Sequence, residues 1–220
     1  KELEAIKPSS NSEPKSIKSS PILEALRRYP RRISLAAGAF LSVQVTFYIL
    51  VAFVLAYGVQ TTDLSRNDLL MAVLVGSAMM VPTQFFFSDY SDKHGRKGIF
   101  MLGALLTALW SFALFPLIET GNFYLVILGV AGGLTFLGMM YGPQAAFFAE
   151  LFSTEVRYSG ASLGYQIGAI VGGSFAPTIA TLLWKNYDIF WVSAYIAFAS
   201  LSSLISVYFL TETYQKDLNE

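Results

Sequence analysis

Six long apolar segments constrain the fold of this chain more than any other feature of its sequence. Each is close to the roughly 20 residues that an α-helix needs to cross the hydrocarbon core of a bilayer. Short polar connections separate them, so consecutive helices are expected to run antiparallel. The sequence predicts an all-α polytopic membrane protein with six transmembrane helices at approximately residues 33–58, 68–88, 98–118, 123–149, 159–184 and 189–210.

The composition agrees with a membrane protein and excludes several functions. Hydrophobic residues make up 54% of the chain and charged residues only 14%, which is unusual for a soluble domain. The formal net charge is zero, so nucleic acid is not an expected partner. There is no cysteine, and His94 is the single histidine, which excludes thiol nucleophiles, disulfides and any Cys- or His-based metal site.

The chain divides into three parts: a polar N-terminal segment, the six-helix domain and a polar tail. Residues 1–32 are expected to form a cytoplasmic loop, with disorder over 1–20 and a short amphipathic helix over 21–29, whose arginines suit an anionic membrane surface. The six-helix domain covers 33–211, and 212–220 form a tail. The first residues lack the pattern of a signal peptide. The chain begins with Lys1 rather than Met, as expected of a fragment or a processed piece.

The basic residues predict the orientation of the spans. With six spans both termini lie on one side, and thirteen of the fifteen Lys and Arg residues fall on that side. The remaining two are Arg66 and Lys185. Because basic residues accumulate in cytoplasmic loops, both termini are expected to be cytoplasmic, in a plasma membrane such as the bacterial inner membrane.

Four glycines spaced four residues apart predict close helix packing in the fifth span. On a helix they form one smooth stripe that lets another backbone approach, as in membrane helix pairs. These glycines are Gly160, Gly164, Gly168 and Gly172.

Two charged connections carry residues that can pair. In the turn after the second span, Asp92 precedes Gly95, Arg96 and Lys97. An acid there can cap the positive N-terminus of an adjacent helix, and Arg96 can make bidentate contacts to a carboxylate. Glu150, at the end of the fourth span, is the natural candidate for that carboxylate.

These motifs resemble those of the major facilitator superfamily. Asp92–Lys97 resembles its inter-helix signature D-R-x-G-R-R/K, although Ser88 stands where that family usually has glycine. Glu150–Arg157 resembles the E-x6-R loop of sugar-porter-like members. The block Tyr141–Pro177 is similar to the metabolite:H+ symporter family, and Pro21–Arg32 is similar to that family's central loop.

The resemblance implies that this chain is the C-terminal half of a twelve-helix carrier, with the N-terminal six-helix half as its partner. Such carriers bind substrate near the bilayer midplane and alternate between inward- and outward-open states. The implied activity is proton-coupled symport of a small organic acid or zwitterion, with no cofactor and the proton gradient as driving force. The implied gate residues are Asp92, Gly95, Arg96, Lys97, Glu150 and Arg157.

Polar residues inside the spans are candidates for contacts with substrate, because they are expensive in lipid. The family lines its cavity chiefly with the first and fourth helices of each half, although each side chain could instead bond to a neighbouring helix. The candidates are Gln44, Tyr48, Gln84, Tyr141, Gln144 and Gln166.

No Asp, Glu, Lys, Arg or His lies well inside any expected span. A proton-coupled carrier needs a titratable group, so the resemblance places that group in the other half, and this chain alone is not expected to transport.

Three alternatives differ in class. An intramembrane serine protease needs a base beside its serine, whereas His94 lies in a connecting turn, so no enzyme is expected. A channel needs a selectivity element, and none is present. A truncated or accessory six-helix protein without transport activity stays open.

Overall fold

The computed structural model describes residues 21–213, and within that range it contains six helical spans long and apolar enough to cross a membrane. Each expected span has a helical counterpart, and no described residue lies in a strand. The predicted disorder of 1–20 and the last part of the tail, 214–220, fall outside the described residues. In chain order the elements are α1 (Pro21–Arg28), α2 (Pro30–Tyr48), η1 (Ile49–Phe53), α3 (Val54–Thr61), α4 (Arg66–His94), α5 (Arg96–Glu119), α6 (Phe123–Glu150), α7 (Arg157–Gly168), η2 (Ala169–Ser174), α8 (Ala176–Asn186) and α9 (Ile189–Phe209).

Polar caps set the beginning of three spans. Ser65 and Asp68 form a capping box at the start of α4, each satisfying a backbone N–H of the other. Asn122 accepts from the N–H groups of Tyr124 and Leu125 at the start of α6, and Asp188 begins α9 in the same way. Helix N-termini carry N–H groups with no partner inside the helix, which these side chains satisfy.

Two spans are interrupted by wider turns that the sequence pattern does not predict. The π-helical segment η1 joins α2 to α3 within the first span, and η2 joins α7 to α8 within the fifth. Pro177, the second residue of α8, lies three residues after the end of η2 and has no N–H to continue the helix, which accounts for the second interruption. Such turns are frequent at functional sites.

The second span is longer than expected, because α4 continues through Asp92 to His94 and only Gly95 separates it from α5. The exposed pair of Lys93 and Asp89, one helical turn apart at 2.6 Å, belongs to this continued helix. Gly95 adopts φ 102°, a conformation that favours glycine. The turn predicted from the sequence is therefore one residue long.

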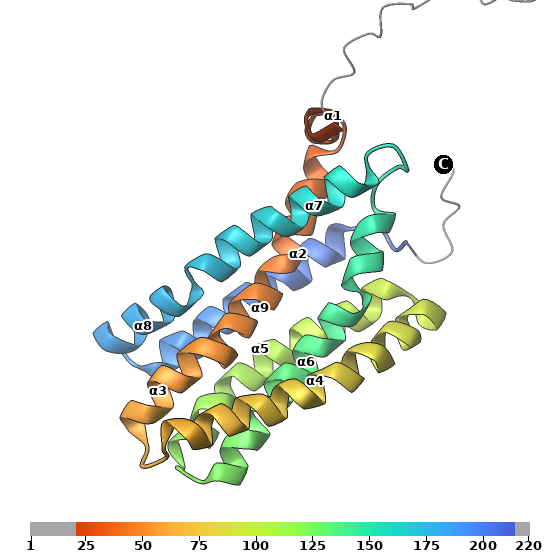
Figure 1. Cartoon of the computed structure of the whole chain (residues 1–220). Helices are drawn as coiled ribbons and strands as arrows, with labels where there is room; N and C mark the ends of the chain where they lie inside the picture. The colour runs from red at the N-terminus through yellow and green to blue at the C-terminus, as the bar shows by residue number, and fades with distance from the viewer. Residues whose placement is uncertain (1–20, 214–220) are drawn as a thin grey trace, which may run out of the picture.

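The spans pack through small and polar residues. Helix α6 packs along both α4 and α5, and α2 packs along α7 and α9 (Figure 1). Between α2 and α9 the hydroxyls of Ser42 and Ser200 lie 2.9 Å apart, and Ser203 donates to the carbonyl of Gly38 at 2.9 Å. These contacts resemble the small-residue and hydroxyl interfaces that hold helices together in lipid.

The predicted glycine stripe lies largely against α2. A Cβ on Gly168 would be 2.7 Å from the carbonyl oxygen of Ala37, and one on Gly164 would be 2.7 Å from Cβ of Ala36. Gly172 approaches the carbonyl of Leu41 in the same manner. Gly160, in contrast, lies against the ring of Phe152 in the preceding loop.

Helix α1 is seen end-on in Figure 1 and lies across the end of the bundle. Ala25 is fully buried, whereas Ile22, Leu23 and Leu26 are exposed. The helix thus contacts the bundle at Ala25 and leaves its larger apolar side chains exposed.

The glycine packing gives the first prediction. Gly168→Ala should lower the free energy of unfolding by about 1–3 kcal/mol, because its methyl group overpacks the backbone of α2. Gly98→Ala is the matched control, since nothing lies within 4 Å of its Cβ. That control should be neutral or raise stability by up to about 1 kcal/mol. Thermal unfolding in detergent compares the two, and equal midpoints would contradict the packing.

Candidate functional site

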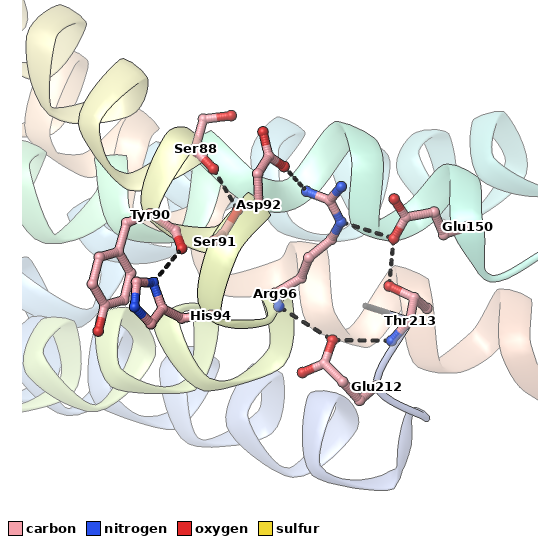
Figure 2. Close-up of polar contacts among 9 residues, drawn as sticks. All are labelled: Ser88, Tyr90, Ser91, Asp92, His94, Arg96, Glu150, Glu212 and Thr213. Carbon is pink, nitrogen blue, oxygen red and sulfur yellow. Dashed lines mark hydrogen bonds and ion pairs between the residues drawn. The ribbon is translucent and has the colours of Figure 1, made fainter. Parts of the chain in front are cut away.

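Arg96, the first residue of α5, connects three helices at one end of the bundle. Its Nε donates to Oε2 of Glu150 at 2.8 Å, and its Nη1 donates to Oδ1 of Asp92 at 2.6 Å (Figure 2). Only 13% of the Arg96 side chain is exposed. The sequence predicts that Arg96 reaches Glu150 with both nitrogens of its fork. The structure instead divides the fork between two acids, which ties the end of α4 to the end of α6.

The acid at the N-terminus of α5 is Glu212, not Asp92. The carboxylate of Glu212 accepts from the backbone N–H groups of Arg96 and Lys97, each at 3.1 Å, and from that of Thr213 at 3.0 Å. A carboxylate in this position satisfies free N–H groups and faces the positive end of the helix dipole. Asp92 lies in the last turn of α4, where its bond to Arg96 is side chain to side chain.

The segment after α9 belongs to the same site. Thr213 Oγ1 donates to Oε2 of Glu150 at 2.6 Å, and Nζ of Lys97 donates to the carbonyls of Tyr208 and Leu210 at 2.6 and 2.9 Å. We call Asp92, Arg96, Glu150, Glu212 and Thr213 the motif network. Sequence reasoning placed Glu212 in the tail and missed it. The available signal was an acid directly after the last span, on the same side as the N-terminus of α5.

Arg157 does not pair with Glu150. Its Nη2 donates to Oγ1 of Thr154 at 3.4 Å, and its Nε is buried with no partner among the described residues. Both acceptor contacts of Glu150 Oε2 come from Arg96 and Thr213. The two charged ends of the E-x6-R loop therefore face different surroundings.

The loop between α6 and α7 is held from the other side by the start of the chain. Arg32 donates to the carbonyl of Leu151 at 2.6 Å, and Arg28 pairs with Glu155 at 3.3 Å. The ring of Tyr29 packs edge-to-face on Phe152. Arg28, one of the arginines expected at the membrane surface, thus contacts protein, and so does Arg32.

A cavity of about 240 Å3 lies between α6 and α7, below the motif network. Its walls include three of the predicted substrate residues, Tyr141, Gln144 and Gln166, together with Tyr165. Gln144 precedes Glu150 by about 9 Å along α6. The cavity therefore lies nearer the network than the middle of the span, where the family resemblance places substrate.

Gln144 is the most distinctive residue of this cavity. It is only 4% exposed, and its Oε1 is buried without a hydrogen-bond partner among the described residues. A buried polar atom without a partner costs about 1–3 kcal/mol, and such atoms often mark a place where a ligand or water binds. The amide oxygen can accept a hydrogen bond from a substrate.

The other three candidates do not line this cavity. Gln44 and Tyr48 pack on the glycines of η2, where the ring of Tyr48 covers Gly173. Gln84 is half-buried on α4, whose backbone approaches α6 at Gly142. The structure thus brings together Tyr141, Gln144 and Gln166, places Tyr48 near Tyr165 of the cavity wall, and leaves Gln44 and Gln84 at other helix contacts.

The cavity is uncharged. No Asp, Glu, Lys, Arg or His contributes to its lining, and residues 21–213 contain no cluster of His, Asp and Glu that could hold a metal ion. Its chemistry is that of aromatic faces, hydroxyls and amides.

Comparison with known proteins shows which family this chain is similar to. The sequence profile of the Major Facilitator Superfamily matches residues 4–157 and 35–220. The chain is similar to the inner membrane metabolite transport protein YhjE of Escherichia coli, at 31% identity over 92% of this chain and 51% of the relative. It is also similar to the shikimate transporter of Escherichia coli, at 33% identity over 80% of this chain and 40% of the relative. A putative proline/betaine transporter of Staphylococcus aureus is 24% identical over 86% of this chain and 41% of the relative. The chain spans about half the length of these relatives, or somewhat less.

The cap on α5 gives the second prediction. Glu212→Ala should lower the free energy of unfolding by about 1–2 kcal/mol, because it leaves backbone N–H groups of α5 without an acceptor. Hydrogen exchange should become faster at the amides of Arg96 and Lys97. Glu155→Ala is the control, since Glu155 is 76% exposed and exposed pairs contribute about 0–1 kcal/mol. Unchanged exchange at Arg96 and Lys97 would refute the cap.

Proposed function

The chain belongs to the major facilitator superfamily, and from this premise we propose that it is the C-terminal half of a secondary active transporter. The transporter would carry a small organic acid or zwitterion together with a proton, by alternating access. The observation that carries the proposal is an uncharged cavity lined by tyrosine and glutamine side chains. It contains a buried amide oxygen, on Gln144, that has no hydrogen-bond partner among the described residues, about 9 Å along α6 from Glu150 of the motif network.

The motif network is suited to act as a gate. It joins the ends of α4, α5 and α6 to the segment after α9 through side chains and backbone groups that can separate without loss of secondary structure. We propose that Asp92, Arg96, Glu150 and Arg157 control conformation and do not contact substrate. In this conformation Arg96 is paired, whereas Nε of Arg157 has no partner among residues 21–213, so Arg157 can form a further bond in another state.

The cavity supports a role in which this half binds substrate through uncharged side chains. Tyr141, Gln144, Tyr165 and Gln166 offer hydrogen bonds and aromatic faces but no charge. A substrate carboxylate or ammonium would then find its ionic partner, and the proton its carrier, in the N-terminal half. Shikimate and proline or betaine, named for the relatives, are substrates of the proposed size and charge. The proton gradient would be the driving force, without a bound cofactor.

The distribution of charge supports an orientation with both termini cytoplasmic. Basic residues gather at one end of the bundle: Lys93, Arg96 and Lys97 flank Gly95, Arg157 begins α7, and helix α1 ends with Arg27 and Arg28. Arg66, at the start of α4, and Lys185, in the last turn of α8, lie at the other end of the bundle, away from the motif network. By the positive-inside rule the end with the motif network would face the cytoplasm, across a bacterial inner membrane.

The third prediction separates a half-transporter from an accessory protein. Cells that express this chain alone should not take up labelled shikimate, betaine or dicarboxylates, whereas cells that express it with the N-terminal half should. A protonophore should abolish that uptake, because the gradient drives it. Uptake by the chain alone would overturn the proposal, and binding of both halves without uptake of any acid would favour the accessory role.

The fourth prediction tests the cavity in the complete transporter. Gln144→Ala should raise the KM about tenfold, which corresponds to ~1.4 kcal/mol and is typical of one lost hydrogen bond. Gln60→Ala is the control, because Gln60 is exposed and donates only to Ala56 within its own helix turn. A KM equal to that of the control would remove Gln144 from the substrate site.

A further inference from the structure

An apolar groove of about 400 Å3 lies between the end of α4 and the beginning of α5, away from the motif network's buried contacts. It exists because α4 and α5 each pack along α6 and make few contacts with each other. Met139 of α6 forms part of its floor. Gly98 widens it, since nothing lies within 4 Å of the position where a Cβ would stand.

The walls of the groove change in chemistry along its length. Phe86 and Leu102 are apolar and exposed, at 63% and 46%. About 12 Å further along α4 the groove reaches His94, whose ring stacks on Tyr90 and whose Nδ1 lies 3.1 Å from the carbonyl oxygen of Tyr90. The other ring nitrogen is available to a ligand at the groove's polar end.

A cation, Lys93, lies beside His94. Nζ of Lys93 is paired with Asp89 at 2.6 Å, but both side chains are more than 60% exposed, and such pairs are weak. Lys93 can therefore turn toward an anion. An apolar channel that ends in a histidine and a lysine, at the end of a membrane-spanning helix, matches a phospholipid in both its acyl chain and its phosphate.

The groove opens on the side of α6 that faces away from the proposed substrate cavity. At ~100° per residue, Tyr141, Gln144 and Phe148 lie about 140–200° around α6 from Met139. On the proposed function, the cavity faces the N-terminal half. If so, the groove faces lipid. This conclusion rests on the proposed function.

We propose that this groove binds one phospholipid of the adjacent leaflet, with an acyl chain between Phe86, Gly98 and Leu102 and the headgroup at His94 and Lys93. The bound headgroup lies next to the Gly95 turn. Lipid binding therefore stabilises the arrangement in which Arg96 holds the ends of α4 and α6 together.

The fifth prediction concerns lipid retained by the full chain in mild detergent. Native mass spectrometry with added 1-palmitoyl-2-oleoyl-phosphatidylglycerol should show one tightly bound lipid per chain. Gly98→Leu should weaken that binding at least about tenfold, because its side chain would occupy the groove from a position whose Cβ has no described neighbour within 4 Å. Gly98→Ala controls for helix propensity, and Leu109→Phe controls for bulk on the same exposed face of α5, three turns away.

The headgroup contact is tested separately. His94→Ala should weaken phosphatidylglycerol binding while leaving the affinity for the diacylglycerol with the same chains unchanged. Equal retention by wild type, Gly98→Leu and Leu109→Phe would show unspecific lipid and overturn the site. Equal affinity for the phospholipid and the diacylglycerol would overturn the headgroup contact.

Thiol labelling distinguishes a lipid in the groove from a protein segment that covers it. The chain contains no cysteine, so Leu102→Cys gives a single reactive thiol in the groove. Added phospholipid should protect it from a maleimide in the wild-type background. Protection by the N-terminal half or by a second chain, without lipid, would overturn the proposal. These measurements need no transport activity, so the site can fail while the proposed function stands.

Discussion

Close approach of helix backbones is the constraint on which this structure depends. Lipid chains are as apolar as leucine, so burial gives helices little reason to associate within a membrane. Small residues compensate for the missing hydrophobic driving force, because they let two helix backbones make many close van der Waals contacts. Gly168 brings α7 against the carbonyl of Ala37 in α2, and Gly142 brings α6 against the backbone of α4 at Gln84. Without such positions the faces that form the cavity and the network would be held apart.

The motif network adds polar contacts where the helices leave the apolar region. Gly95 is the only residue between α4 and α5, and its φ of 102° reverses the chain within one residue. That reversal places the side chain of Arg96 toward α6 and its N–H toward Glu212. One arginine thus takes part in an ion-pair network and a helix cap, so a change at either one is transmitted to the other.

Local pattern and charge were sufficient to predict the spans and the contact between Arg96 and Glu150. The span pattern is strong because twenty apolar residues have few other uses, and a buried arginine requires a carboxylate. Glu212 was missed because a chain end supplies it, and no periodicity links it to Gly95. The segment η1 was missed because Ile49–Phe53 contains neither proline nor glycine. Which polar residues meet in a cavity depends on helix rotation, which spacing along one helix does not determine.

Helix α6 separates two environments and connects them mechanically. One side carries Gln144 and the cavity, the other carries Met139 and the groove, and its end carries Glu150. Because a packed helix moves as a unit, a tilt that opens the cavity must also change the groove and strain the contact with Arg96. A ligand that prefers one position of α6 at either face therefore shifts the population of the other, by no more than its own difference in affinity for the two states. In this architecture a phospholipid and a substrate would be coupled through one rigid helix, without a contact between them.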